Sequence, residues 1–377
     1  MIYLNSAATS YPKPACVVDA YMQSINALPS AQFRSAGIFD NSDLFVQTKE
    51  RLGKILGIKN SENIYFTSGS TEGLNRIISG LPYRADEYMT TATEHNSVLR
   101  PLFNLTEGAE PVIIPCDDSG RVSVAQMEQM LTGRTKALIV NHCSNVTGAI
   151  QDLQAMGRFA RQHRLMFIVD VSQSAGCVEI RADEWEIDAL AFTGHKSLLG
   201  VQGTGGYYVR DGIILRPLLY GGSGKDSMRI RYEPDDYEYE VGTLNSNGIA
   251  ALNRAAAYIL DKGIDRIHER ESELAGYLID GLSRIDHVKL YGKDLQNRGP
   301  VVSLSVDGIS PADVAYILQS NYNIITRAGL QCAPLIHACI GSGQNGTLRI
   351  SFSDESTTAE LDEVTAAVRE IADAANG

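Results

Sequence analysis

The sequence predicts an α/β fold, with a large domain built on a mostly parallel sheet and a smaller α+β domain at the carboxyl end. The chain has 377 residues, which is too long for one ordinary core and long enough for two domains. Short apolar strands alternate with helical stretches through the first two thirds, as in parallel sheets covered by helices on both faces. The last third instead carries long helical stretches and alternating strands.

The predicted strands of the large domain lead into polar residues. A strand at 63–67 is followed by a glycine-containing turn and a helix. Further strands are predicted at 88–91, 136–140 and 165–169 and in the apolar run that ends at Thr193, with a crossover helix at 154–163. In sheets of this kind, ligands bind at the carboxyl ends of the strands.

The smaller domain is predicted from a change of pattern. It contains a helical stretch at 248–284, alternating strands at 301–306 and 348–352, and a closing helix at 358–375. We therefore expect residues 13–250 to form the large domain and residues 251–377 the small one, joined by an N-terminal segment, 1–12.

Composition excludes several classes of partner. The formal net charge is −12 and no long Lys/Arg cluster occurs, so we expect neither nucleic acid nor an anionic membrane as a partner. No apolar run reaches 18 residues, and the N-terminus lacks a basic segment followed by an apolar one, so we expect no membrane span and no secretory signal. The six cysteines show no paired spacing, which favours reduced thiols and a cytoplasmic location.

The most informative motif is a lysine that follows an apolar strand. Thr193-Gly-His195 precedes Lys196, and a lysine there can form a Schiff base with an aldehyde cofactor. Thr193 and His195 can hold a phosphate. The alternative is an ordinary surface lysine beside a histidine.

A second motif is the turn after the strand at 63–67. Its glycines allow a tight turn, and the following helix N-terminus presents free N–H groups to an anion. Ser70 and Thr71 can add hydroxyl hydrogen bonds to a phosphate. The alternative is a plain helix cap.

Three further strand ends carry candidate cofactor contacts. Asp170, with Gln173 three residues later, can pair with a protonated pyridine nitrogen, unless it only caps a helix. Asn145 can bond a phenolic oxygen or a carboxylate, although asparagine is also common in turns. His95 can stack on a planar ring and move protons, unless it is a structural loop histidine.

Cys332 lies in a predicted loop between Gly329 and Pro334, where a thiol can be mobile and reactive. The alternative is a buried structural thiol. Cys332, His337 and Cys339 supply only three metal ligands, without a second cluster, so we expect no metal site. The cysteines at 16, 116, 143 and 177 are interpreted as structural.

Taken together, these segments resemble the class V aminotransferase-like enzymes that use pyridoxal 5′-phosphate (PLP), specifically the cysteine desulfurases. The similarity is carried, in order along the chain, by segments 3–9, 69–73, 94–96, 144–148, 170–173, 193–196, 241–245, 327–334 and 346–351. The resemblance implies the fold-type I fold of PLP-dependent transferases and a homodimer. It implies that sulfur passes from L-cysteine to Cys332 as a persulfide, with release of L-alanine.

The resemblance also assigns roles to single residues. It implies that Lys196 anchors PLP, that His95 stacks on the ring and acts on the substrate thiol, and that Thr243 reaches the phosphate of the partner subunit. Ala7, Asn145 and Arg349 are expected to contact the substrate. The implied cofactor contacts are Ser70, Thr71, His95, Asn145, Asp170, Gln173, Thr193, His195, Lys196 and Thr243.

The loop around Cys332 is compact, with Ala-Pro directly after the cysteine, which is similar to group II of the family. Group II members often need a protein sulfur acceptor. The sequence departs from the family's usual pattern at two places. Gln331 stands where many members carry histidine, and residues 353–357 stand where many carry a Tyr-Asn-Thr element. Four alternatives stay open: a selenocysteine lyase, another C–S lyase, a class V aminotransferase, and a non-catalytic scaffold with the same fold.

Overall fold

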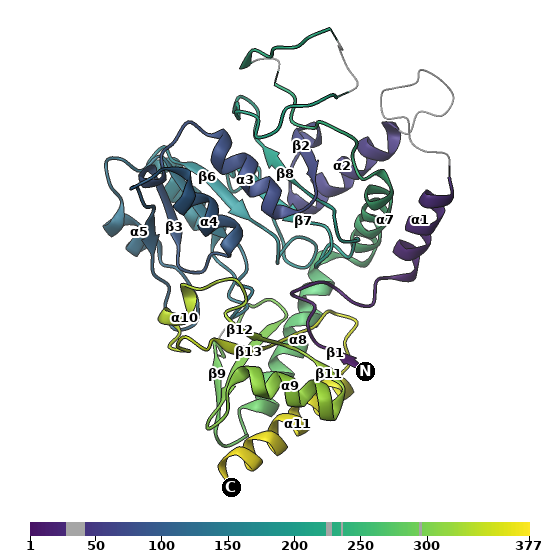
Figure 1. The fold of residues 1–377 in the computed structure, drawn as a ribbon, viewed down its shortest axis with the longest axis vertical. Coiled ribbons are helices and arrows are strands. Elements are labelled where there is room, and N and C mark those ends of the chain that lie inside the picture. The colour runs from purple at the N-terminus through teal and green to yellow at the C-terminus, as the bar shows by residue number, and fades with distance from the viewer. Residues whose placement is uncertain (28–41, 224–227, 235–236, 294–295) are drawn as a thin grey trace.

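The computed structural model describes residues 1–27, 42–223, 228–234, 237–293 and 296–377 (Figure 1). Its largest element is a seven-stranded sheet in which only β8 runs antiparallel to its neighbours, among the residues described. The mostly parallel sheet predicted from the sequence is therefore confirmed. In spatial order the strands are β2 (Ile64–Thr67), β8 (Gly205–Val209), β7 (Ala189–Thr193), β6 (Met166–Asp170), β5 (Ala137–Asn141), β3 (Tyr88–Thr91) and β4 (Val112–Ile114).

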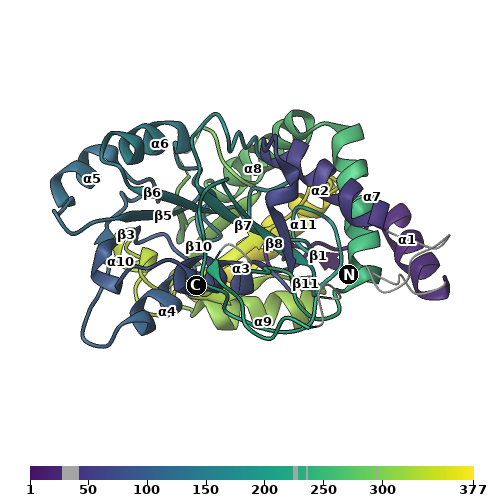
Figure 2. The ribbon, with the colours of Figure 1, turned by 90° about the horizontal axis from the view of Figure 1, so that it is seen from above.

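Helices cover both faces of this sheet, as Figure 2 shows for α6 on one side and α3 and α4 on the other. Along β5, Ala137 and Ile139 join one core cluster, whereas Leu138 and Val140 join the other. Because both faces are buried, the strand reads as a continuous apolar run. The helices of this part are α1 (Ala15–Asn26), α2 (Ser42–Leu56), α3 (Ser70–Gly80), α4 (Asn96–Leu105), α5 (Val124–Met130) and α6 (Leu153–Gln162), with short 3-10 turns at Ser61–Asn63 and Ala85–Glu87.

The helical stretch predicted at 248–284 is divided into α7 (Ser246–Lys262) and α8 (Ile264–Leu282). The break is at Gly263, whose φ of 89° is left-handed and favours glycine at a helix end. Helix α7 buries Leu252 in the large core, whereas α8 buries Leu278 in a separate core. We keep the two-domain division as a proposal and favour Gly263 as its boundary, since a cut at residue 250 would divide α7.

The C-terminal core is built on a four-stranded antiparallel sheet of β12 (Arg327–Gly329), β13 (Thr347–Ser351), β10 (Val301–Val306) and β9 (Val288–Tyr291). Helices α8, α9 (Pro311–Tyr322) and α11 (Thr358–Asn376) contribute its apolar residues. Strand β1 (Ile2–Tyr3) pairs with β11 (Ile324–Ile325), which attaches the N-terminal segment to this part of the fold. A last short helix, α10, spans Ile336–Cys339. In the described part of the chain, no helix is long and apolar enough to cross a membrane.

Candidate active site

The strand ends of the large sheet surround a cavity of about 430 Å³. It opens where parallel α/β sheets place their ligands. Nine of the residues singled out in the sequence line it, and they come from segments that are far apart in the chain. They are Ser70, Thr71, His95, Asn145, Asp170, Gln173, Thr193, His195 and Lys196.

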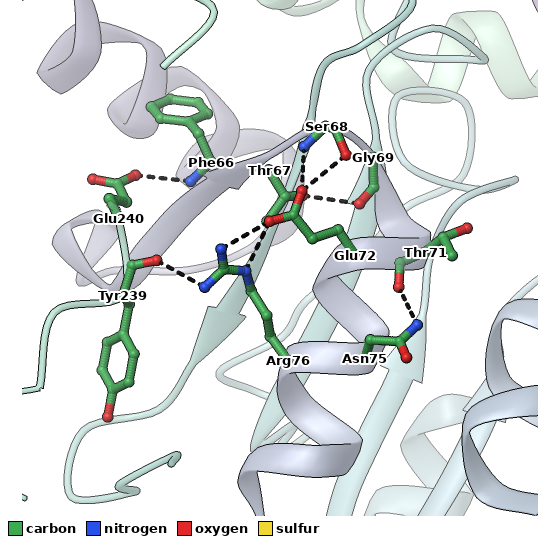
Figure 3. A network of polar contacts seen from close by, with 10 residues as sticks. All are labelled: Phe66, Thr67, Ser68, Gly69, Thr71, Glu72, Asn75, Arg76, Tyr239 and Glu240. Carbon is green, nitrogen blue, oxygen red and sulfur yellow. Dashed lines mark hydrogen bonds and ion pairs between the residues drawn. The ribbon is translucent and has the colours of Figure 1, made fainter. Parts of the chain in front are cut away.

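One end of the cavity is suited to an anion. Helix α3 begins after Gly69, which provides no capping side chain, so the first N–H groups of the helix are available to a ligand. Figure 3 shows how the turn before the helix is held. The Glu72 carboxylate accepts hydrogen bonds from the N–H (3.0 Å) and hydroxyl (2.8 Å) of Ser68, and Arg76 donates to its other oxygen at 2.8 Å. The turn is therefore fixed from behind by a charged pair.

Arg76 also connects this turn to the segment that contains Thr243. Its guanidinium donates to the carbonyl oxygen of Tyr239 at 3.3 Å, and the Glu240 carboxylate accepts the N–H of Phe66 at 2.8 Å (Figure 3). Thr243 itself is exposed and lies in a neighbouring hollow with Glu72 and Arg76. It is not among the residues that line the main cavity of this chain.

Lys196 lies in the loop that follows β7 and lines the cavity. Removal from water lowers the pKa of its amine to about 8, an effect that Asp170 opposes and Arg349 reinforces. A lysine with a lowered pKa has a larger neutral fraction at physiological pH than a free lysine, and the neutral amine is a nucleophile for a carbonyl carbon. The loop needs Gly194, because a side chain at that position would collide with Thr204.

His195 is held by its backbone, which leaves its ring available. Its carbonyl oxygen accepts hydrogen bonds from Ser10 N–H (3.0 Å), the Thr9 hydroxyl (3.1 Å) and the Lys13 amine (2.8 Å). Its ring Nδ1 is buried and has no hydrogen-bond partner among the described residues. Burial, with Lys196 nearby, lowers its pKa to about 4, so the ring is neutral at pH 7. An orphaned buried ring nitrogen is satisfied if a ligand binds beside it.

Asp170 is the last residue of β6 and is buried in the cavity wall. Its Oδ1 accepts the N–H of Ser172 at 2.9 Å and the Ser172 hydroxyl, and among the described residues Oδ2 accepts no hydrogen bond. Ser172 therefore fixes the orientation of the carboxylate and leaves one oxygen for a ligand. Such an oxygen can accept a proton-bearing ring nitrogen through a charge-assisted bond.

His95 is the N-cap residue of α4 and lines the same cavity. Its Nδ1 accepts the backbone N–H of Ser97 at 3.0 Å, which assigns the proton of the neutral ring to Nε2. Burial, followed by the charge of Lys196, lowers the pKa of His95 to about 4. In this tautomer Nε2–H is a hydrogen-bond donor for an anionic ligand group.

Arg349, on β13, is a buried cation that is only partly compensated. It donates to the backbone carbonyl of Asn145 at 3.1 Å and to the side-chain oxygen of Asn5 at 2.9 Å, and its Nε has no partner among the described residues. Burial lowers its pKa only to about 10, so it stays charged at pH 7. A buried guanidinium with two neutral acceptors can bind a carboxylate.

The N-terminal segment and the Cys332 turn are attached to these residues. Ala7 accepts a hydrogen bond from the Gln173 amide at 2.9 Å, and Asn145 donates to the carbonyl of Gln331 at 2.7 Å. The carbonyl of Cys332 accepts the N–H of Asn96, the residue after His95, at 2.7 Å. The Cys332 side chain is exposed. Three predicted site residues do not line the cavity: Ala7, Cys332 and Arg349. Each is nevertheless hydrogen-bonded to a residue of the cavity wall or to the residue next to one in the chain.

Sequence reasoning missed some residues that support this site. Asn5 holds Arg349, Ser172 holds Asp170, and Glu94, the residue before His95, is buried. Glu94 had a signal in the sequence, since it is an acidic residue in the turn after a buried strand. Asn5 lies in segment 3–9, which carries the family resemblance, but its bond to Arg349 had no signal, because the two residues are distant in the chain. Among the described residues, no group of three His, Cys, Asp or Glu side chains could hold a metal ion.

Comparison with known proteins agrees with this geometry. Residues 2–364 match the aminotransferase class-V family. The chain belongs to this family. A probable cysteine desulfurase of Methanothermobacter thermautotrophicus is 31% identical, over 98% of this chain and 94% of that protein. A probable cysteine desulfurase of Halobacterium salinarum is 32% identical, over 98% and 91%.

Solved structures of the family are also similar to this chain. A cysteine desulfurase from Thermococcus onnurineus has a TM-score of 0.85 and 30% identity, over 99% of this chain and 95% of that one. A cysteine desulfurase from Escherichia coli has the same TM-score with 26% identity, over 99% and 94%. The fold class and the family resemblance predicted from the sequence are confirmed.

Proposed function

We propose that the protein is a PLP-dependent cysteine desulfurase that takes sulfur from L-cysteine and releases L-alanine. The observation that carries the proposal is the single cavity in which Lys196, Asp170 and His95 meet, with the Cys332 turn bonded to the residue after His95. Family membership and the cysteine desulfurase relatives agree with this activity.

The residues present fit PLP. The uncapped N-terminus of α3 and the orphaned Nδ1 of His195 are suited to a phosphate, and the free oxygen of Asp170 is suited to a pyridinium nitrogen. When bound, PLP supplies an aldehyde carbon for the amino group of the substrate and an electron sink for the bonds at its Cα. Lys196 would hold the cofactor and then move the Cα proton through its amine.

The substrate would be oriented by its carboxylate. Arg349 and Asn145 are bonded to each other, and Asn5 and the segment with Ala7 pack beside them, so we propose these residues as the carboxylate site. The donor Nε2–H of His95 would hydrogen-bond to the substrate sulfur. Cys332 would attack that sulfur as a thiolate, so that an S–S bond forms and the C–S bond breaks; the electron pair of the broken bond stays on the substrate carbon, which takes up a proton to become the methyl group of alanine.

The remaining parts of the proposal concern assembly and location. A persulfide on exposed Cys332 is accessible to an acceptor, which we propose to be a protein thiol. We propose a homodimer in which Thr243 serves the partner's cavity, and a cytoplasmic location, in keeping with the six free cysteines.

The deciding experiment is to incubate the purified, PLP-loaded protein with L-cysteine and a reducing thiol, and to assay alanine, sulfide and pyruvate. A desulfurase gives alanine and sulfide in equal amounts. Pyruvate with ammonia would instead indicate a C–S lyase, and exchange of the amino group would indicate an aminotransferase. Selenocysteine turned over to alanine while L-cysteine is not would indicate a selenocysteine lyase.

A further inference from the structure

A second cavity, of about 560 Å³, is lined by residues to which the proposed reaction gives no role. Its wall includes the loop after β5, the start of α6 and the first two turns of α8. No described residue lines both this cavity and the cavity of Lys196. The second cavity is therefore a separate site, and it brings loops of the large sheet together with α8.

His142 is a buried histidine at this cavity whose ring Nδ1 is unpartnered. It follows β5 directly, is 2% exposed and lines the cavity. Its Nδ1 has no hydrogen-bond partner among the described residues. Burial lowers the pKa of His142 to about 3, so the ring is neutral at pH 7. A buried polar atom normally has a partner in a native fold, and a ligand in the cavity would provide one.

A second histidine at the cavity repeats this feature. His268, on α8, places its Nε2 2.7 Å from the side-chain oxygen of Asn297. Because that oxygen only accepts hydrogen bonds, Nε2 carries the proton, and Nδ1 of the neutral ring is an acceptor. This Nδ1 is also buried and unpartnered within the described ranges. The cavity therefore offers imidazole nitrogens to a ligand that carries N–H donors.

The charged side chains around the cavity favour a cation. Three carboxylates line it, from Asp152, Glu179 and Asp265, against the one guanidinium of Arg121. Glu179 is paired with Arg181 at 2.7 Å. In the part of the chain that the structure describes, Asp152 and Asp265 form no ion pair. Unpaired negative charge at a cavity attracts cations and disfavours anions.

Trp185 adds an aromatic surface to this set. It is half-buried, lines the cavity and lies edge-on to His142, with the ring centroids 6.0 Å apart and the ring planes at 74°. Indole is the aromatic ring that attracts cations most strongly, and a planar guanidinium can stack on it while its N–H groups donate in its own plane. Imidazole nitrogens and carboxylates are the acceptors that such donors need.

One loop connects this cavity to the proposed carboxylate site. The N–H of Gln151 donates to the carbonyl of His142 at 2.9 Å, and the N–H of Ser144 donates to the carbonyl of Ala149 at 2.9 Å. The base of the loop, at His142 and Gln151, lines the second cavity, whereas Asn145 lines the cavity of the proposed reaction. A ligand that holds His142 would therefore restrain the loop that carries Asn145.

We propose that the second cavity binds a small alkylguanidinium cation, which donates hydrogen bonds to His142 and Asp265, stacks on Trp185 and restrains the loop 142–151. Binding there does not depend on the proposed function. Only the meaning of the restraint for a substrate carboxylate at Asn145 rests on that function.

The test uses the full-length, PLP-loaded protein and methylguanidine as the probe, because a guanidinium does not compete with the Lys196 amine for PLP as a primary amine would. Trp185 is the only tryptophan of the chain, so its fluorescence reports on this cavity. Methylguanidine should change that fluorescence saturably, with the same dissociation constant in calorimetry. N-methylurea, which has the same shape without the charge, should bind far more weakly. Hydrogen exchange at residues 142–151 should slow with methylguanidine.

Variants locate the binding. Asp265→Asn should weaken methylguanidine binding roughly twofold to fivefold, the contribution of an exposed charge pair. Glu269→Gln makes the same charge change at an exposed position of α8 that does not line the cavity, so it should bind as the wild type. His142→Leu removes the ring nitrogens and should weaken binding as well. If the buried His142→Leu variant does not fold, Asp265→Asn and its control still decide the question.

Three outcomes would overturn the proposal: equal binding of N-methylurea and methylguanidine, equal dissociation constants in Asp265→Asn and Glu269→Gln, and binding without slower exchange at residues 142–151. Alanine release from L-cysteine is measured in parallel. Absence of that activity in a protein that binds methylguanidine as expected would refute the proposed function and leave the cation site standing.

Discussion

At the scale of single residues, this site depends on ionisable groups removed from water. Burial lowers the pKa of Lys196 to about 8 and those of His95 and His195 to about 4. The neutral fraction of the amine at physiological pH is thereby much larger than in a free lysine, and both imidazoles are neutral. Arg349 stays charged beside them. The proposed carboxylate-binding group, Arg349, therefore keeps its charge, whereas the proposed proton-transfer group, Lys196, can gain or lose a proton.

The first prediction concerns Lys196. Lys196→Ala should remove the visible absorbance band of covalently bound PLP and lower alanine release from L-cysteine to background, because no other amine lines the cavity in the described residues. The matched control is Lys54→Ala, an exposed lysine on α2, which should keep both properties. A PLP adduct on another lysine, trapped with borohydride in Lys196→Ala at the wild-type level, would contradict the assignment.

The second prediction separates Cys332 from cofactor binding. Cys332→Ser should bind PLP and show a spectral change with L-cysteine, yet form no persulfide and release little alanine, because a hydroxyl is far less nucleophilic than a thiolate. Mass spectrometry of the wild type should place one extra sulfur on the peptide that contains Cys332. Wild-type rates of alanine and sulfide release by the variant would show that Cys332 is not the nucleophile.

The third prediction concerns stability and pH. Glu94 is buried, and this burial raises the pKa of its carboxyl from 4.5 to about 8. Between these values the unfolded chain has lost the proton that the folded chain retains. The free energy of unfolding should therefore fall with rising pH, by at most about 1.4 kcal/mol per pH unit from this group.

Glu94→Gln removes this titration, so its free energy of unfolding should fall less steeply between pH 5 and 8 than that of the wild type. Urea denaturation at several pH values measures the slopes. Glu107→Gln, at an exposed site, is the control and should keep the wild-type slope. Equal slopes for Glu94→Gln and the wild type would show that Glu94 is already ionised in the folded protein.

At the scale of elements, the sequence was most informative where burial is uniform. The strands β5 and β6 were predictable because both faces of the sheet are covered and their apolar runs are unbroken. The break at Gly263 was not predicted, since a glycine within a helical pattern does not by itself end a helix. The contacts between Arg349, Asn145 and Gln331 were also beyond prediction, because they join three segments that only the folded chain brings together.

The fourth prediction concerns the turn before α3. Glu72→Ala removes the acceptor that fixes Ser68 and the partner of buried Arg76, so the N–H groups of the helix should be less well placed for phosphate. Hydrogen bonds to charged groups contribute about 1.5–3 kcal/mol, so PLP affinity should fall roughly tenfold or more. Asn75→Ala, which removes a side-chain bond to the Thr71 carbonyl on the same helix, is the control. Equal dissociation constants for PLP in both variants would show that the charged pair does not position the turn.

At the scale of the whole molecule, the two sheets and the N-terminal segment meet around one cavity. Residues 1–12 pair with β11 at one end and contact the carbonyl of His195 at the other. Arg349 extends from the small sheet to Asn145, in the loop after β5 of the large sheet. Each substrate contact that we propose thus depends on how the two cores are held together.

The last prediction concerns assembly. Thr243 is exposed and lies beside the cavity of its own chain without lining it, so its hydroxyl has no role in that cavity. If it donates to a phosphate in the partner's cavity, the protein should sediment as a dimer, and dilution to monomer should release PLP. Thr243→Val keeps the shape and removes the hydroxyl, so it should weaken PLP binding without changing the dimer.

The Thr243 test needs a control in the same segment. Asn245→Ala changes the residue that caps α7, so any loss through disturbance of the segment alone should appear there as well. PLP affinity reduced in Thr243→Val more than in Asn245→Ala, with both variants dimeric, is the expected result. A monomer with full activity in sedimentation and turnover assays would refute the shared site, because one chain would then supply every phosphate contact by itself.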